Sequence, residues 1–259
     1  MQFYRNNSFV LHYQWIDNNK PRTFLFINAL GTDFRIWDSV VQPLQQHGNV
    51  LLFDKRGHGL SDIVPGTKDL SAFADDAEAL LNHLQIGKFI PVGLSVGGMI
   101  AQLLANHIPD KMEKIVLCDT RHKIGNDQMW DERIALIKEK GLPAISEGVM
   151  QRWFSEKFRN EEATKVSGCR NMLERCPTVG YLKTCEAIRD ADLTSIAKKI
   201  KIPTLCVVGS EDKSTTPGEV KDLAGLVEGA RYEVIKGSGH IPCVDNPTEL
   251  CNLIVDFVN

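Results

Sequence analysis

Short apolar runs alternate with amphipathic segments through the first half of the chain, and this alternation predicts strands and helices in turn. Apolar runs of this length between helical patterns are typical of parallel strands that are buried on both faces. The predicted strands cover residues 9–16, 23–29, 49–55, 89–95 and 114–120, and the predicted helices cover residues 36–47, 70–85 and 96–107. We therefore expect a doubly wound α/β sheet, with an antiparallel start where the first two strands come close together.

The strand pattern is then interrupted by a long helical stretch. Helix formers with scattered aromatic residues take over in segments such as ISEGVMQRWFSEKF and VGYLKTCEAIRD. The strand pattern resumes at 202–210 and 231–237, and the chain closes with a helical pattern at 247–258. An insertion with α/β sequence on both sides is a candidate lid. We predict an α/β core of residues 1–120 and 195–259 that carries a helical cap at 121–194.

The overall composition is that of an ordinary globular protein. The chain has 259 residues, of which 43% are hydrophobic and 24% charged, so neither a disordered chain nor a disulfide-dense mini-protein fits. The net charge is −3 and the basic residues are spread along the chain, so we expect neither a nucleic acid nor a membrane as partner. A small molecule is the expected partner, and the sequence leaves open whether the chain forms a homo-oligomer.

The N-terminus and the cysteines favour a cytoplasmic protein. The first residues, MQFYRNNSFVLHYQW, contain no basic stretch followed by an apolar run, and no later apolar segment approaches the roughly 18 residues that a membrane helix needs. The seven cysteines lack paired spacing, which predicts reduced and mostly buried thiols. The histidines lack the spacing of metal ligands and the glycines lack a dinucleotide fingerprint, so we predict no metal and no cofactor.

The strongest local motif is Gly93-Leu94-Ser95-Val96-Gly97, which fits the pattern GxSxG. It lies directly between a predicted strand and a predicted helix, the context in which this pattern holds a nucleophilic serine on a sharp turn. The two glycines let the backbone turn sharply enough to expose the hydroxyl. Taken alone, a glycine-rich turn of this kind could equally cradle a phosphate.

Chain order supports the nucleophile reading. A serine hydrolase of this type needs an acid after a late strand and a histidine after the next strand. Asp212 follows LCVVGSE and His240 follows YEVIKGSG, in that order. We therefore predict Ser95 as nucleophile, His240 as general base and Asp212 as the acid that orients the histidine, with Glu211 as a rival for the acid.

Two backbone N–H groups are candidates for an oxyanion hole. The N–H of Val96 follows the nucleophile, and the N–H of Leu30 lies in the loop after the strand TFLFIN. The alternative for the second loop is a simple tight turn in which Gly31 supplies the backbone freedom. The charged segment 54–61, DKRGHGLS, is predicted to be a structural loop with internal hydrogen bonds rather than a second site.

With these residues in place, the chain resembles the α/β-hydrolase superfamily over essentially its full length, through GLSVG, DKRGHGLSD, GSEDKSTTP and GSGHIP. Within it, the chain is similar to the 3-oxoadipate enol-lactonases of aromatic catabolism. That narrower resemblance rests on NALGTD at 28–33 with Trp37, on KIG at 123–125 with Trp130 and Arg133, and on Gly180-Tyr181 followed by CEAIRDADL at 185–193.

The resemblance implies hydrolysis of a small anionic enol-lactone to 3-oxoadipate. A buried substrate carboxylate requires a cation near the serine. Arg189 and Arg133 are the candidates, with Trp130 as an apolar wall; the alternative is that both arginines face solvent, as most do. Other open readings are a carboxylesterase, a C–C bond hydrolase, a perhydrolase with the same triad, and a ligand receptor built on a hydrolase scaffold.

Overall fold

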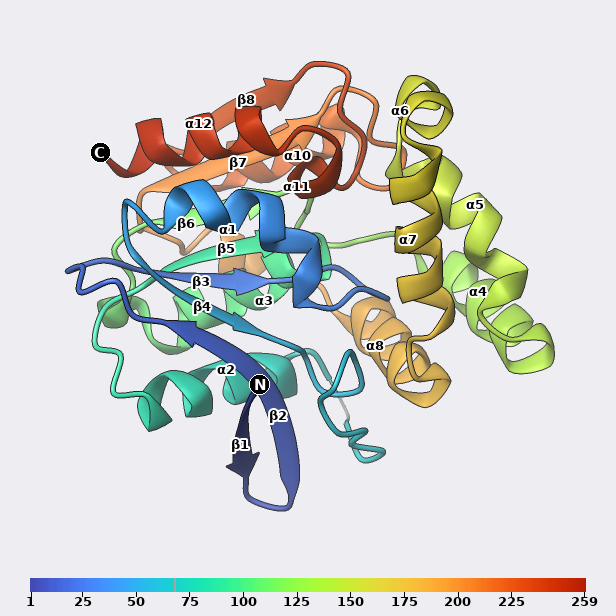
Figure 1. Ribbon diagram of the computed structural model, residues 1–259, viewed down its shortest axis with the longest axis horizontal. Coiled ribbons are helices and arrows are strands. Elements are labelled where there is room, and N and C mark those ends of the chain that lie inside the picture. Colours follow the sequence, from blue (N-terminus) through green and yellow to red (C-terminus); the bar gives the residue numbers. More distant parts are fainter. Residues whose placement is uncertain (68) are drawn as a thin grey trace.

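The computed structural model describes residues 1–67 and 69–259, and its centre is a single sheet of eight strands (Figure 1). The strand order across the sheet is β1-β2-β4-β3-β5-β6-β7-β8. The strands are β1 (Gln2–Asn6), β2 (Phe9–Ile16), β3 (Thr23–Ile27), β4 (Asn49–Phe53), β5 (Ile90–Leu94), β6 (Ile115–Cys118), β7 (Thr204–Gly209) and β8 (Arg231–Ile235).

All pairs from β4 to β8 are parallel, which confirms the predicted sheet type. Every residue of β3, β4, β5, β6 and β7 is buried. This explains why these strands read as continuous apolar runs: helices cover both faces of the sheet, so no side of the strand can remain polar.

The antiparallel start of the sheet differs from the prediction. The predicted first two strands are not neighbours, because β2 pairs antiparallel with β4, while β3 pairs parallel with β4 and β5. A further strand, β1, forms an antiparallel hairpin with β2. Its pattern of alternating half-buried and exposed residues is that of an edge strand, which carries a weaker apolar signal than a central one.

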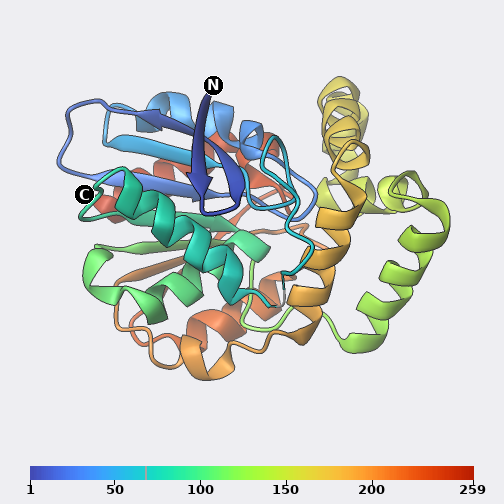
Figure 2. The same cartoon turned by 90° about the horizontal axis from the view of Figure 1, so that it is seen from below.

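Two helical layers flank the sheet (Figures 1 and 2). On one face α1 (Asp38–Leu44), which continues the 3₁₀ turn η1 (Phe34–Trp37), packs with α11 (Pro242–Asp245) and α12 (Pro247–Val258). On the other face α2 (Ser71–His83) packs on α3 (Val96–His107), and α3 is followed by the turn η2 (Pro109–Lys111). The same face holds α9 (Thr194–Ala197) and α10 (Pro217–Leu226).

Five helices lie between β6 and α9 and stand to one side of the sheet, beside the carboxyl ends of its parallel strands (Figures 1 and 2). They are α4 (Asp127–Lys140), α5 (Pro143–Trp153), α6 (Glu156–Glu161), α7 (Ala163–Glu174) and α8 (Thr178–Asp190), and we call them the cap. The cap contacts the core closely at Gly57 and Gly180, where a Cβ added to either glycine would lie within 2.5 Å of the other residue's backbone. Glycine is therefore required at this contact.

The seven cysteines are all buried and unbridged, as the sequence predicts. Across residues 1–67 and 69–259, none of the helices combines the length and the apolar character that a membrane span requires.

Candidate active site

Ser95 lies at the sharp turn between β5 and α3 and has φ 56° and ψ −120°. A non-glycine residue in this region stores about 1–3 kcal/mol of strain, which persists only where the surroundings enforce it. Gly97 permits the turn, because a Cβ there would lie 2.1 Å from the Ile27 carbonyl oxygen at the end of β3. The structure thus gives the motif the strand–turn–helix context that a nucleophilic serine needs.

His240 and Asp212 meet beside this turn. Asp212 follows β7 and His240 follows β8, and His240 Nδ1 lies 2.8 Å from Asp212 Oδ2. Both side chains are almost fully buried. The backbone N–H of His240 donates to the Trp153 carbonyl of α5 at 2.7 Å, so the cap holds the histidine loop in place. Glu211, the rival acid, is exposed.

The carboxylate of Asp212 is held in its charged form. Burial alone would raise its pKa, but the facing His240 and several hydrogen bonds lower the pKa below its ordinary value. Asp212 Oδ1 accepts from the backbone N–H of Ser214 at 2.7 Å, and Oδ2 accepts from the Thr215 hydroxyl at 2.7 Å. An ionised acid fixed in this way can orient the imidazole and stabilise an imidazolium.

A second carboxyl group, Asp119, lies behind the pair. It follows β6 with φ 44°, it is fully buried, and its Oδ1 accepts from the Gly209 N–H at 2.9 Å. Burial and then the charge of Asp212 raise the pKa of Asp119 well above its usual range, which favours the protonated form of Asp119 beside the ionised Asp212.

Asp119, Asp212 and His240 each place one potential ligand atom within 4.8 Å of the other two, so this trio is the place in the described part of the chain where a metal ion could sit. The arrangement suits a triad better than a metal, because His240 Nδ1 is already hydrogen bonded to Asp212 and the raised pKa of Asp119 disfavours the ionised form that a metal would bind.

Ser95 and His240 open onto the same cavity of about 120 Å³, which lies between the core and the cap. The core contributes Ala29 and Leu30 to its lining, and the cap contributes residues of α4, α5 and α8. Within the described residues, the backbone N–H groups of Leu30 and Val96 have no hydrogen-bond partner. Both N–H groups are therefore free to donate, and their predicted role in an oxyanion hole stays a prediction.

Two of the predicted substrate contacts line this cavity. Trp130 and Arg133 both come from α4, and the guanidinium of Arg133 lies over the Trp130 and Tyr181 rings at 5.5 and 5.6 Å. Arg133 also donates to the Tyr181 hydroxyl, and the Trp130 indole N–H donates to the Ile124 carbonyl. These contacts fix the orientation of both side chains.

The structure does not bring Arg189 to the cavity, so the predicted substrate contact is not made there. Its guanidinium binds Asp131 and Asp190 on the outside of the cap, each at 2.7 Å, and it does not line the cavity. The two carboxylates, one on α4 and one beside it on α8, satisfy the charge of Arg189. We therefore withdraw this residue as a candidate for the substrate carboxylate.

The chain matches the family model of the alpha/beta hydrolase fold over residues 22–247. It belongs to the α/β-hydrolase family. Among curated relatives, 3-oxoadipate enol-lactonase 2 of Acinetobacter baylyi is 32% identical over 92% of this chain and 88% of its own length. The same organism's 3-oxoadipate enol-lactonase 1 is 30% identical, over 93% of this chain and 89% of its own length.

A solved structure of the enol-lactonase from Burkholderia xenovorans superposes on this hydrolase with a TM-score of 0.95. It is 31% identical, and the match covers 99% of both chains. A hydrolase from Pseudomonas aeruginosa superposes with a TM-score of 0.94 at 29% identity, over all of this chain and 98% of that one. The coverage is nearly complete, so the likeness includes the cap as well as the core.

Arg152 and Thr215 also line the cavity of this hydrolase, and sequence reasoning missed both. Arg152 lies at the end of α5, next to the residue whose carbonyl holds His240. Burial and then the nearby charge of Arg133 lower its pKa below the ordinary value. The sequence could have indicated Thr215, because it follows the predicted acid, Asp212, by three residues. Nothing in the sequence singles out Arg152, because arginines occur on all the cap helices.

A larger cavity of about 820 Å³ lies next to η1 and α7. Its lining includes Gly31 and Thr32 from the loop after β3, but neither Ser95 nor His240. The candidate nucleophile and base thus line the smaller cavity only.

Proposed function

We propose that this hydrolase opens 3-oxoadipate enol-lactone to 3-oxoadipate, with Ser95 as nucleophile, His240 as general base and Asp212 as the orienting acid. The observation that carries the substrate class is the pair of guanidinium groups, Arg133 and Arg152, that line the cavity beside Ser95. Within the described part of the chain, neither forms an ion pair with a carboxylate. The likeness to curated enol-lactonases at about 30% identity supports the same choice.

Two cations that face each other without a counterion repel one another, and partial burial makes the repulsion larger. A substrate carboxylate between them would relieve this repulsion and form charge-assisted hydrogen bonds. The small cavity favours a compact metabolite over a long acyl chain. Lys213, which also lines the cavity, adds a third basic residue near the reactive serine.

The reaction follows from these positions. His240 takes the proton of the Ser95 hydroxyl as the oxygen attacks the ring carbonyl, and the N–H groups of Leu30 and Val96 stabilise the oxyanion. The ring C–O bond then breaks as His240 gives its proton to the leaving oxygen, and the resulting enol, still part of the acyl group on Ser95, tautomerises to the ketone, which makes the departure easier than that of an alkoxide. His240 finally activates water against the acyl-enzyme, which releases 3-oxoadipate.

The Ser95 hydroxyl and His240 are not hydrogen bonded to each other in the described residues, although they share the cavity. Such catalytic contacts are often long in a free enzyme and shorten when substrate binds. We expect this contact to form when substrate binds.

The test is the loss of ultraviolet absorbance of enzymatically generated 3-oxoadipate enol-lactone, measured beside hydrolysis of p-nitrophenyl acetate. Fast lactone turnover that is abolished in Ser95→Ala, with kcat/KM well above that for the ester, is the expected result. Ester hydrolysis with an inert lactone would overturn the substrate and leave a carboxylesterase or a C–C bond hydrolase. Equal turnover by Ser95→Ala would overturn the mechanism.

A further inference from the structure

Lys55 is a fully buried lysine whose charge the mechanism above does not use. It follows β4, the residue is 1% exposed, and its Nζ donates to the Ala29 carbonyl oxygen at 2.9 Å. Among the described residues it forms no ion pair with a carboxylate within 4.0 Å. Burial lowers the pKa of Lys55 to about 7. A buried ammonium group is expensive, so its position requires a reason other than packing.

The carbonyl that Lys55 binds belongs to the same peptide unit as the Leu30 N–H. No peptide bond in the described chain is cis, and in a trans peptide the C=O and the N–H point in opposite directions. A donor that holds the Ala29 oxygen therefore also fixes the direction of the Leu30 N–H. That N–H is one of the two groups free to bind the oxyanion.

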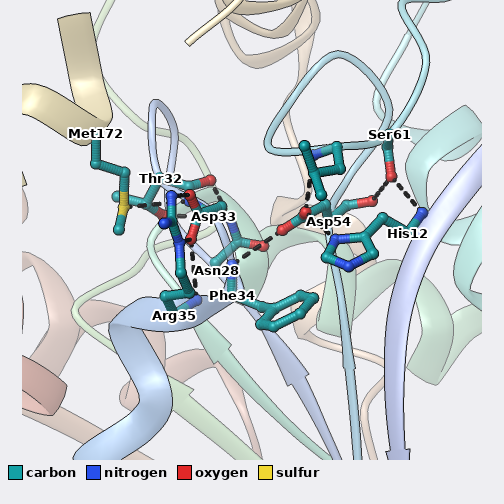
Figure 3. Close-up of polar contacts among 10 residues, drawn as sticks. His12, Asn28, Thr32, Asp33, Phe34, Arg35, Asp54, Ser61 and Met172 are labelled. Carbon is teal, nitrogen blue, oxygen red and sulfur yellow. Dashed lines mark hydrogen bonds and ion pairs between the residues drawn. The ribbon is translucent and has the colours of Figure 1, made fainter. Parts of the chain in front are cut away.

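The rest of this loop is held in the same way. The Thr32 hydroxyl donates to the Ala29 carbonyl at 2.9 Å, and the Asn28 amide donates to Thr32 (Figure 3). The Gly31 N–H donates to His58 Nε2 at 3.1 Å. Burial, and then the charge of Lys55, keep the pKa of His58 well below its ordinary value, so the ring is neutral and can accept this bond.

Other buried polar groups near Lys55 bond to residues outside the loop 28–32. Asp54 accepts from the Phe34 and Leu60 N–H groups and contacts His12 Nδ1 at 2.8 Å (Figure 3). The Ser61 hydroxyl donates to the Asp54 carbonyl. These bonds agree with the structural role predicted for the segment 54–61. Lys55 differs from the other residues of this segment because it binds the Ala29 carbonyl.

We propose that Lys55 is a positioning residue of the oxyanion hole, which orients the Ala29–Leu30 peptide and polarises its N–H toward the developing negative charge. This role rests on the proposed serine mechanism but not on the choice of the lactone as substrate. When it is protonated, Lys55 places a cation on the carbonyl side of the peptide, which draws electron density from the amide and strengthens its N–H as a donor. The gain is larger in the transition state, because charge develops there.

The test compares Lys55→Met with Ser61→Ala, a variant that removes a buried hydrogen bond from the same segment without touching residues 28–31. Two quantities are measured for each: kcat and KM with p-nitrophenyl acetate, and the dissociation constant of phenylboronic acid, which forms a tetrahedral anionic adduct with a reactive serine. A melting curve verifies that each variant is folded at the assay temperature.

We expect Lys55→Met to lower kcat by about 10- to 100-fold with little change in KM, and to weaken boronate binding by a similar factor. Ser61→Ala should lower the melting temperature and leave both quantities within about twofold of wild type. Unchanged kcat and boronate affinity in folded Lys55→Met would overturn the role. Should that variant not fold, Thr32→Val, which removes the second side-chain donor to the Ala29 carbonyl, must lower both kcat and boronate affinity by a smaller factor.

The two proposals fail in different ways. A wild-type protein that cleaves the ester and binds the boronate but leaves the lactone intact overturns the substrate only. A wild-type protein that does neither overturns the serine mechanism, and the role of Lys55 with it.

Discussion

Replacement of Arg152 by Gln is the sharpest test of the anionic substrate. The substitution keeps a polar side chain and removes one of the two guanidinium charges, those of Arg133 and Arg152, that line the cavity. A charge-assisted hydrogen bond to a carboxylate contributes about 1.5–3 kcal/mol, or about 10- to 150-fold in binding. Because Arg133 remains to hold the carboxylate, we expect a loss near the lower end, about tenfold in kcat/KM for the lactone.

The assay follows lactone and p-nitrophenyl acetate in parallel for wild type, Arg152→Gln and Arg189→Gln. The ester is neutral, so its kcat/KM should stay within about twofold in both variants. Arg189→Gln is the matched control, because Arg189 lies on the same cap but binds Asp131 and Asp190 outside the cavity.

A loss through KM is expected, since the carboxylate is bound equally in the ground state and the transition state. The free protein should not lose stability in Arg152→Gln, because the variant removes a repulsion and no ion pair. Unchanged lactone kinetics, or an equal loss for lactone and ester, would show that Arg133 and Arg152 do not bind the substrate carboxylate.

Three further predictions concern the frame of the site. Asp119→Asn should raise the free energy of unfolding at pH 7–8. In the wild type, the folded state keeps a proton on Asp119 that the unfolded chain releases above about pH 4, so the stability of the wild type falls as pH rises. Denaturation of both proteins at pH 7 and at pH 8 measures the difference in stability between variant and wild type. Thr215→Val removes the hydroxyl that donates to Asp212, which should lower ester kcat by about tenfold, with KM unchanged. Gly98→Val should lower the melting temperature markedly, because its Cβ would lie 2.4 Å from the Thr120 side chain.

The central sheet could be predicted because burial on both faces leaves a direct trace in the sequence. The helix 96–107 and the closing helix 247–258 matched their predicted bounds. The hairpin strand β1 was missed because an edge strand is half exposed and carries no continuous apolar run. Helix α10 was also missed, although Thr216 and Glu219 form a capping box with Pro217 between them, a signal that was available.

The positions of the catalytic candidates could be predicted for a different reason. Ser95 is fixed by a local turn, and Asp212 and His240 follow strands whose carboxyl ends must meet at one edge of a parallel sheet. The cap gives no such constraint. Arg133, Arg152 and Arg189 all lie on amphipathic helices, and only the way these helices dock on the core decides which arginine faces the serine. That docking depends on contacts distant in sequence, such as Gly57 with Gly180.

Two neighbouring residues of α5, Arg152 and Trp153, contact different parts of the candidate site. The Trp153 carbonyl holds the backbone of His240, while the side chain of Arg152 lines the cavity. The first contact uses only main-chain atoms, so it survives substitution of either side chain, whereas the second depends wholly on the residue at position 152. If Arg152 binds the substrate as proposed, a substitution there would change the substrate without moving His240, because the two contacts use different atoms of the same turn. Likeness across the whole fold therefore does not identify the substrate, which depends on the side chains that the cap places in the cavity.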